Sequence, residues 1–381
     1  MAKDKRLNLI AIFTMKKKIV LISALFLCTM ANAQSIDKAI NAAVDSFITE
    51  KMKALKITGI AIAVVRNGEV INQSVYGMAN LEWNAKVSSH TNFQIASCTK
   101  LMTSTLLLKA ISTGKIHLED PVGLYLDTIP DAWKSIRIKH LISHSSGLRE
   151  FKGDPYTPID IVVRSLKDST LEYSPGTGQH YAQADFMLLS FILGKIYHKS
   201  FPDLVNDEIA IPLKMNDGGY DMETKTGSLM RTKLIKERAT TYYDLKGSMQ
   251  GYKFIYPQFY YSAGAYYASI SDLTNWAIGL DNDVLFSKQL VDGMIYGQDY
   301  IGEKKSSYTQ AGWILENENG ITYAGHSGGP GLSEILRFPK EGYTFIVLSN
   351  DGELLPGLAR AIASFYIKGL PPKFIVEKFD R

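Results

Sequence analysis

The order of apolar and polar residues predicts a helix and a hairpin near the start of the chain. Apolar residues recur at three- and four-residue intervals over residues 36–55, which is typical of an amphipathic helix. Two apolar, β-branched runs follow, over residues 58–65 and 70–76. Asn67-Gly68 lies between these runs, and Asn-Gly between two such runs is a strong hairpin signal.

The rest of the pattern predicts a helical middle and a return to strands. Helical spacing begins beside Ser97 and meets no Gly or Pro before Gly114. Further helices are expected over residues 138–143, 185–197, 201–211 and 272–280, and a last one over 355–368. Short strands are expected over residues 311–315, 321–324, 333–338 and 343–348.

This order predicts an α/β chain of the α+β type, with one antiparallel sheet built from both chain ends and flanked by helices. We expect a single domain over residues 34–381. Its sheet lobe would span about 34–95 and 300–381, and its mostly helical lobe about 96–299.

The first residues have the pattern of an export signal. Lys16-Lys17-Lys18 precedes an apolar run over residues 19–30, and Ala31-Asn32-Ala33 follows it. A basic start, a short apolar segment and an Ala-x-Ala site are typical of a secretory signal peptide. We therefore expect residues 1–33 to be removed near Ala33, with translation starting at Met1 or Met15, and the protein to be periplasmic or secreted. The apolar run is too short for a stable membrane span.

Charge and cysteine content argue against a nucleic-acid partner and an internal disulfide. The 381 residues carry a formal net charge of +4, but beyond residue 33 there are 36 Lys and Arg against 37 Asp and Glu. The excess of basic residues therefore belongs to the leader, and nucleic acid is not an expected partner. Cys98 is the single cysteine beyond the leader, so an internal disulfide is excluded there.

The strongest chemical signal is Ser97 with Lys100, three residues apart at the start of a helix. Both side chains would project from one face. A serine hydroxyl needs a base, and a desolvated lysine can lose its proton and act as one. Ser-x-x-Lys also occurs at Ser35…Lys38 and Ser112…Lys115, where a helix cap and a helix end are the better readings.

Two later segments could converge on Ser97. The first is His180-Tyr181-Ala182-Gln183, before a helix, where packing is the ordinary role of a tyrosine. The second runs from Gly325 through His326-Ser327-Gly328-Gly329 to Gly331, between two strands. Its glycines are consistent with a simple loop or with backbone N–H groups approaching a ligand.

With these segments in order, the chain resembles the penicillin-recognising serine hydrolases, in the branch of class C β-lactamases, D-alanyl-D-alanine carboxypeptidases, D-aminopeptidases and related esterases. That family carries Ser-x-x-Lys, Tyr-x-Asn and Lys-Thr-Gly or His-x-Gly in that order. The resemblance covers nearly all of the chain beyond the leader. Other segments similar to the family's signatures lie at residues 59–68, 93–100, 118–122, 140–148, 211–215, 262–264 and 271–273.

The resemblance implies a role for each matching residue. Ser97 would be the acylated nucleophile, Lys100 its base or proton relay, and Tyr181 the donor of a proton to the leaving group. The backbone N–H groups of Ser97 and Gly329 would form the oxyanion hole. The remaining expected substrate-binding residues are Gln183, His326, Ser327 and Gly328. No cofactor is implied, and the partner is a small-molecule or peptide substrate, with peptidoglycan-derived peptides among the candidates.

Two departures from the family pattern bear on the substrate. Gln183 stands where the family has Asn, so its amide is displaced by one methylene. His326 opens the third motif in place of Lys, and histidine is only partly charged near neutral pH. The departures favour ester or peptide substrates over β-lactams and C-terminal D-alanine.

The sequence therefore predicts an exported serine hydrolase that acts through an acyl-enzyme on esters, D-amino-acid peptides or β-lactams. The alternative is a lapsed enzyme of the same fold that binds cell-wall peptides or a partner protein. His140 and His144 lie four residues apart, but no acidic third ligand has a suitable spacing, so no metal is expected. We expect Cys98 to serve packing. The tyrosine-rich tract over residues 252–267 is consistent with either the core or the site.

Overall fold

The computed structural model describes residues 35–329, 331–372 and 376–379. A helix occupies residues 35–55, as the periodicity predicts, and a boundary between two compact units falls after Ile48. The predicted leader lies outside the described residues, so export stays a prediction. No helix in the described ranges is both long enough and apolar enough to cross a membrane.

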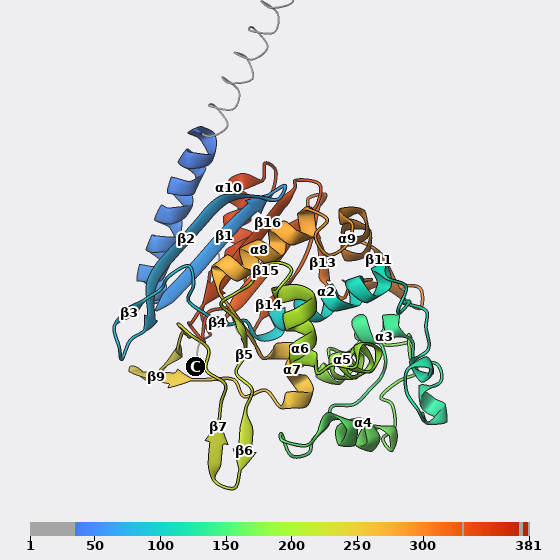
Figure 1. Cartoon of the computed structure of the whole chain (residues 1–381). Coiled ribbons are helices and arrows are strands. Elements are labelled where there is room, and N and C mark those ends of the chain that lie inside the picture. Colours follow the sequence, from blue (N-terminus) through green and yellow to red (C-terminus); the bar gives the residue numbers. More distant parts are fainter. Residues whose placement is uncertain (1–34, 330, 373–375, 380–381) are drawn as a thin grey trace, which may run out of the picture. The chain divides into compact units, whose positions relative to one another are not determined.

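Beyond residue 48, the described residues include a nine-stranded antiparallel sheet whose strands come from both ends of the chain (Figure 1). Its strand order is β11-β12-β13-β14-β15-β16-β1-β2-β3. The strands are β1 (Gly59–Arg66), β2 (Glu69–Asn80), β3 (Ala85–Lys86), β11 (Gln298–Ile301), β12 (Lys304–Thr309), β13 (Ile314–Glu318), β14 (Ile321–Gly328), β15 (Ser333–Phe338) and β16 (Tyr343–Ser349). The predicted sheet from both chain ends is confirmed.

The β1–β2 hairpin turns at Asn67-Gly68, where the sequence predicts it. Both residues have positive φ, 50° and 78°, which a tight two-residue hairpin turn requires. Ile60 pairs with Tyr76 on one side and with Ser349 on the other. β1 therefore lies inside the sheet, and its residues 59–65 are all buried.

Helices cover both faces of the sheet. Asn72 donates to Tyr366 of α10 (Leu358–Tyr366), whereas the adjacent Gln73 donates to Ser271 of α8 (Ile270–Asp281). Neighbouring residues of a strand point to opposite faces, so α8 and α10 cover opposite faces. Figure 1 shows the same arrangement, with α8 in front of β1 and β16 and α10 behind them.

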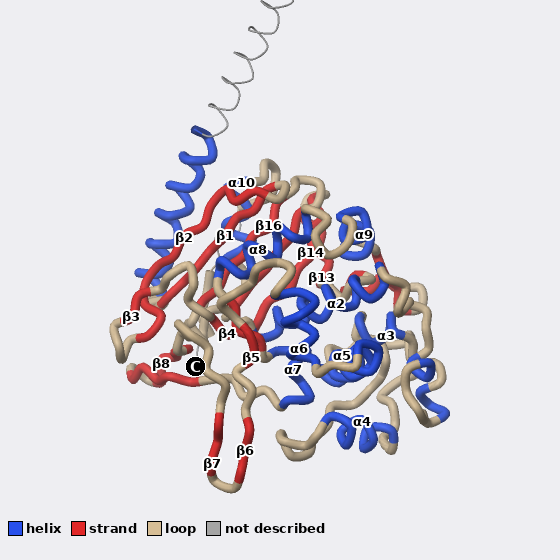
Figure 2. The backbone as a smooth tube through the Cα atoms, in the orientation of Figure 1, coloured by secondary structure: helices blue, strands red, loops and turns tan. Residues whose placement is uncertain are grey.

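The middle of the chain is mostly helical, as predicted (Figure 2). Besides α8, its helices are α2 (Thr99–Ser112), α3 (Ile138–Ile142), α4 (Ile159–Lys167), α5 (Gln183–Tyr197), α6 (Phe201–Val205), α7 (Tyr261–Gly264) and α9 (Lys288–Ile295). Short 3-10 helices are η1 (Ala96–Cys98), η2 (Val122–Leu124), η3 (Asp131–Trp133) and η5 (Gln258–Tyr260). The helix expected over 201–211 continues past α6 as a short π-helix, η4 (Asn206–Ala210).

Three small sheets interrupt this helical region, and the sequence pattern does not predict them. One has the order β4-β10-β5, from β4 (Phe93–Gln94), β10 (Tyr266–Ala268) and β5 (Gly219–Tyr220). The others are hairpins, β6 (Thr224–Thr226) with β7 (Leu229–Arg231), and β8 (Thr241–Leu245) with β9 (Ser248–Tyr252). The residues of β6 and β7 are all exposed, so no apolar alternation marks them.

Candidate active site

Ser97 lies in a sharp turn between a strand and a helix. β4 ends at Gln94, the 3-10 helix η1 holds Ser97, and α2 begins at Thr99. Ser97 thus precedes the α-helix proper, within a continuous helical path to Lys100. Ala96 has a φ of 44°, a left-handed conformation that a residue with a Cβ adopts at some cost. The strained residue directly precedes the candidate nucleophile.

Hydrogen bonds from three elements hold this turn. The Ile95 N–H donates to the Tyr266 carbonyl of β10 at 3.0 Å, and Ser333 Oγ of β15 donates to the Ile95 carbonyl at 2.6 Å. Cys98 is fully buried, and its thiol donates to the His326 carbonyl at 3.2 Å. Burial raises the pKa of the Cys98 thiol to about 12, so the expected packing role is confirmed and the residue is not a second nucleophile.

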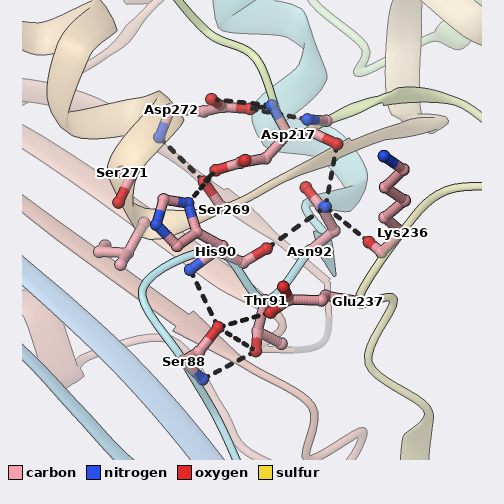
Figure 3. Close-up of polar contacts among 12 residues, drawn as sticks. Ser88, His90, Thr91, Asn92, Asp217, Lys236, Glu237, Ser269, Ser271 and Asp272 are labelled. Carbon is pink, nitrogen blue, oxygen red and sulfur yellow. Dashed lines mark hydrogen bonds and ion pairs between the residues drawn. The ribbon is translucent and has the colours of Figure 1, made fainter.

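A polar cluster anchors the segment that enters β4 (Figure 3). The Asn92 side-chain amide donates to the Asp217 and Lys236 carbonyls, at 3.0 and 2.9 Å. His90 Nδ1 and Ser269 Oγ both contact the same oxygen of Asp217, at 2.9 and 2.7 Å. The serine hydroxyl is thus bonded to the carboxylate and not to the histidine. This set resembles a catalytic triad in composition, but its geometry is that of a structural clamp.

Lys100 lies at the buried base of the site. Its Nζ donates to the Ala263 carbonyl of α7 at 2.9 Å and lies 4.6 Å from the ring centroid of Tyr181. Burial lowers the pKa of Lys100 to about 7, and the negative charge of Glu150 opposes that shift. A large fraction of Lys100 is therefore a neutral amine near neutral pH, as a base requires.

Tyr181 contacts the candidate nucleophile directly. Its hydroxyl donates to Ser97 Oγ at 2.9 Å. Tyr181 lies two residues before the first residue of α5. Burial raises the pKa of Tyr181 well above its ordinary value, so the phenol stays protonated. The structure thus brings together Ser97, Lys100 and Tyr181, which the sequence predicts to act together.

His144 packs against the ring of Tyr181 and contacts the backbone of the next residue. The two ring centroids lie 4.7 Å apart, and His144 Nδ1 accepts the backbone N–H of Ala182 at 3.2 Å. The same nitrogen lies 3.3 Å from Asp185 Oδ2. Burial lowers the pKa of His144 and raises the pKa of Asp185, so burial favours the neutral form of each group in this contact.

The third predicted motif lies in a strand and not in a loop. β14 continues through Gly328, so the strand predicted to end at residue 324 is longer. His326 and Gly328 share one face of β14, and strand alternation places the Ser327 side chain on the other. Gly329 follows at the exposed strand end. The backbone of this segment lies beside the nucleophile turn because Gly328 leaves room for it.

His326 is neutral in this environment. Its Nδ1 lies 2.6 Å from the Ser327 carbonyl, which can only accept, so the proton is on Nδ1. Burial lowers the pKa of His326 to about 3, with the charge of Lys100 as a second cause. Among the described residues, Nε2 has no partner. His326 therefore offers an acceptor lone pair and not the cation that a lysine would supply.

Gln183 is the first residue of α5, and a carboxylate accepts its backbone N–H. That carboxylate is Glu150, whose other oxygen accepts the Tyr260 hydroxyl. The Gln183 Oε1 atom is buried without a hydrogen-bond partner among the described residues. Glu150 lies two residues after the end of the 140–148 signature, but no spacing connects it to Ser97, so sequence alone gives no signal for it.

No group of three or more metal-binding side chains occurs in the described part of the chain. His140 Nδ1 accepts the Arg137 N–H at 3.1 Å at the start of α3, whereas His144 lies beyond the end of that helix. The two histidines therefore have separate structural contacts.

Comparisons with known proteins show the family and the fold of this chain. The family model Beta-lactamase matches residues 44–364. The chain is 23% identical over 312 residues to the penicillin-binding protein PbpX of Bacillus subtilis (strain 168), covering 80% of this chain and 73% of PbpX. It is 26% identical over 332 residues to the protein Flp of Staphylococcus aureus (strain MW2), covering 83% of this chain and 64% of Flp.

A solved structure has the same fold. The octameric penicillin-binding protein homologue from Pyrococcus abyssi aligns with a TM-score of 0.66 at 23% identity, over 81% of this chain and 73% of that one. At this identity the likeness concerns the fold alone. Because the family model spans most of the sequence and the fold agrees, this chain belongs to the beta-lactamase family.

Proposed function

We propose that this protein is an exported serine hydrolase that cleaves ester or amide bonds through an acyl-enzyme on Ser97. The family relationship supports a serine-hydrolase type of function. The observation that carries the proposal is the Tyr181 hydroxyl 2.9 Å from Ser97 Oγ, beside a buried Lys100 whose pKa is about 7. These groups supply a nucleophile, a base and a proton donor.

In the proposed acylation, neutral Lys100 takes the Ser97 proton while Oγ attacks the scissile carbonyl. The backbone N–H groups of Ser97 and Gly329 stabilise the oxyanion. The bond to the leaving group then breaks, and that group takes the Tyr181 proton. The Lys100 ammonium returns a proton to Tyr181. Water then cleaves the acyl-enzyme by the reverse sequence and regenerates the free serine.

The neutral state of His326 bears on the substrate. A substrate carboxylate would need a cation at this position, and His326 supplies only an acceptor. We therefore place esters and peptides without a carboxylate at the scissile end ahead of β-lactams and C-terminal D-alanine peptides. Because PbpX is described as a penicillin-binding protein, penicillin remains a necessary probe.

Export is part of the same proposal and rests on the leader sequence. Lys16-Lys17-Lys18, the apolar run and Ala31-Asn32-Ala33 support cleavage near Ala33. Mass analysis of the protein recovered from outside the cytoplasm tests it, with a mature chain beginning at Gln34 as the expected result. An uncleaved chain confined to the cytoplasm would contradict it.

Hydrolysis of a panel of esters, D- and L-amino-acid amides and a penicillin tests the catalytic proposal. We expect turnover of at least one ester or amide, and its loss in Ser97→Ala. Turnover that persists in Ser97→Ala would contradict the proposal. Saturable binding of cell-wall peptides without turnover or a covalent adduct would instead establish the lapsed, peptide-binding alternative.

A further inference from the structure

Glu150 places a carboxylate in the immediate surroundings of the candidate catalytic residues. One oxygen accepts the backbone N–H of Gln183, two residues after Tyr181, and the other accepts the Tyr260 hydroxyl. The Phe151 N–H donates to the same Tyr260 hydroxyl at 3.1 Å, so this hydroxyl is bonded to two adjacent residues. Its negative charge acts on Lys100 as the largest influence that opposes burial.

This carboxylate keeps capacity for a further partner. Glu150 is only half-buried, and a carboxylate can accept about four hydrogen bonds, whereas the hydrogen bonds described here supply two. Three further polar site residues expected from the sequence are uncharged. His326 is neutral, Tyr181 is a protonated phenol and Gln183 is an amide. Lys100 is the nearby cation, and it must be neutral to act as the base.

A substrate cation would complete this arrangement. An ammonium group paired with Glu150 would offset the charge that favours protonated Lys100. The same pairing would therefore help Lys100 to stay in its neutral, basic form. A carboxylate-bearing substrate would find a repelling charge in Glu150 and no cation in His326.

We propose that Glu150 is a specificity-determining residue that binds a primary ammonium on the acyl side of the substrate, so that aminoacyl esters and amides are preferred. This inference rests on the proposed function, because it concerns the same site and the same Ser97 chemistry. It goes further by naming the charge and the chemical class of the acyl group.

Two matched esters test the inference on the mature chain. They are alanine benzyl ester, in both enantiomers, and its N-acetyl counterpart, which removes only the ammonium. The measured quantity is the ratio of their kcat/KM values at pH 7, because each ratio compares two substrates on the same enzyme. Glu150→Gln removes the charge and keeps both hydrogen bonds, since its amide can accept from Gln183 and donate to Tyr260. Glu172→Gln, whose carboxylate contacts His180 on the outer surface, is the control.

We expect the native protein to prefer the free-amine ester by at least about tenfold, the usual range for one charge-assisted hydrogen bond. Glu150→Gln should remove most of that preference, and Glu172→Gln should keep it. An equal ratio in the native protein and Glu150→Gln, with both esters cleaved, would overturn the inference and leave the proposed function intact. Loss of all turnover together with no covalent labelling of Ser97 would overturn both.

If Ser97 is labelled by a fluorophosphonate but neither ester is cleaved, a second measurement tests the inference. Alaninamide and N-acetylalaninamide are then compared as protectants against labelling of Ser97 by a fluorophosphonate. Stronger protection by alaninamide, lost in Glu150→Gln, supports the inference. Equal protection by the two amides contradicts it.

Discussion

Gly328 of β14 lies directly against the backbone of Ile95, two residues before the candidate nucleophile. A Cβ at position 328 would come within 2.2 Å of the Ile95 carbonyl oxygen and 2.4 Å of Ser333 Oγ. No side chain larger than hydrogen fits there without a backbone shift. The strand that carries His326 and leads to Gly329 is thus set by a backbone-to-backbone contact with the nucleophile turn.

Replacing Gly328 with alanine should therefore destabilise the folded protein. We expect Gly328→Ala to lower the free energy of unfolding by about 2 kcal/mol or more, because the contacting atom belongs to the backbone and cannot rotate away. Denaturant titration measures this change. Gly329→Ala is the matched control, since a Cβ there would meet nothing within 4 Å. Equal stability of both variants would contradict the close-contact explanation.

The pH dependence of activity should report the state of Lys100. Its neutral form is the base, and its pKa is lowered to about 7 in the folded protein. Activity is therefore present above this pH and lost as the pH falls through it. On an uncharged ester, kcat/KM should rise with pH to a plateau, with a midpoint near 7 and a loss of about tenfold per pH unit below it.

Lys100→Arg should abolish that profile. Arginine stays protonated at every accessible pH, so we expect kcat/KM to fall by about 10²–10⁴-fold and the midpoint near 7 to disappear. Lys115→Arg, at the Ser112…Lys115 repeat of the motif, should retain native kinetics. Native activity in Lys100→Arg would exclude Lys100 as the base.

Removing the charge of Glu150 should move the same profile. The Glu150 carboxylate favours the protonated form of Lys100 and so raises its pKa. In Glu150→Gln the midpoint of kcat/KM on an uncharged ester should therefore shift to lower pH, while the plateau rate stays close to native. An upward shift or no shift would show that Glu150 does not act on Lys100.

His144 variants should separate its two contacts with the Tyr181 segment. Asparagine tolerates the left-handed φ of 57° at this position and offers an acceptor for the Ala182 N–H. Phenylalanine keeps an aromatic ring but leaves that N–H unsatisfied, a cost of about 1–3 kcal/mol.

We therefore expect His144→Phe to be less stable and slower in acylation than His144→Asn. Thermal unfolding and the rate of Ser97 labelling measure the two effects. If His144→Phe were the milder change, ring packing would outweigh the hydrogen bond as the support for Tyr181.

The sequence predicts the centre of the large sheet, because β1, β15 and β16 carry apolar runs between turn residues. It does not predict β3, β11 or β12. β15 occupies residues 333–338, as the pattern predicts, and the hairpin at Asn67-Gly68 follows from backbone preferences alone. The sequence does not predict β6 and β7, because their residues are all exposed and show no apolar alternation. It also does not predict the end of β14, because the glycines around His326 are typical of a loop. The domain limits expected from the sequence stay predictions.

Some residues of the candidate site are predicted from the sequence, and others are found only in the structure. Ser97, Lys100 and Tyr181 lie within short motifs, so their residue types and order suffice to predict them. Glu150, His144 and the strained Ala96 act through contacts between segments far apart in the chain or through backbone geometry. Neither kind of information is present in local spacing, so these residues emerge only from the structure.

The most direct test of the account is the intact mass of the mature protein, residues 34–381, after exposure to a fluorophosphonate and, separately, to a penicillin. Ser97→Ala is the control. We predict one fluorophosphonate adduct per chain that is absent in Ser97→Ala, since the reagent requires an activated serine. A penicillin adduct in addition would extend the substrate range to β-lactams. A folded native protein that forms no adduct with either reagent would contradict the central claim that Ser97 is an activated nucleophile.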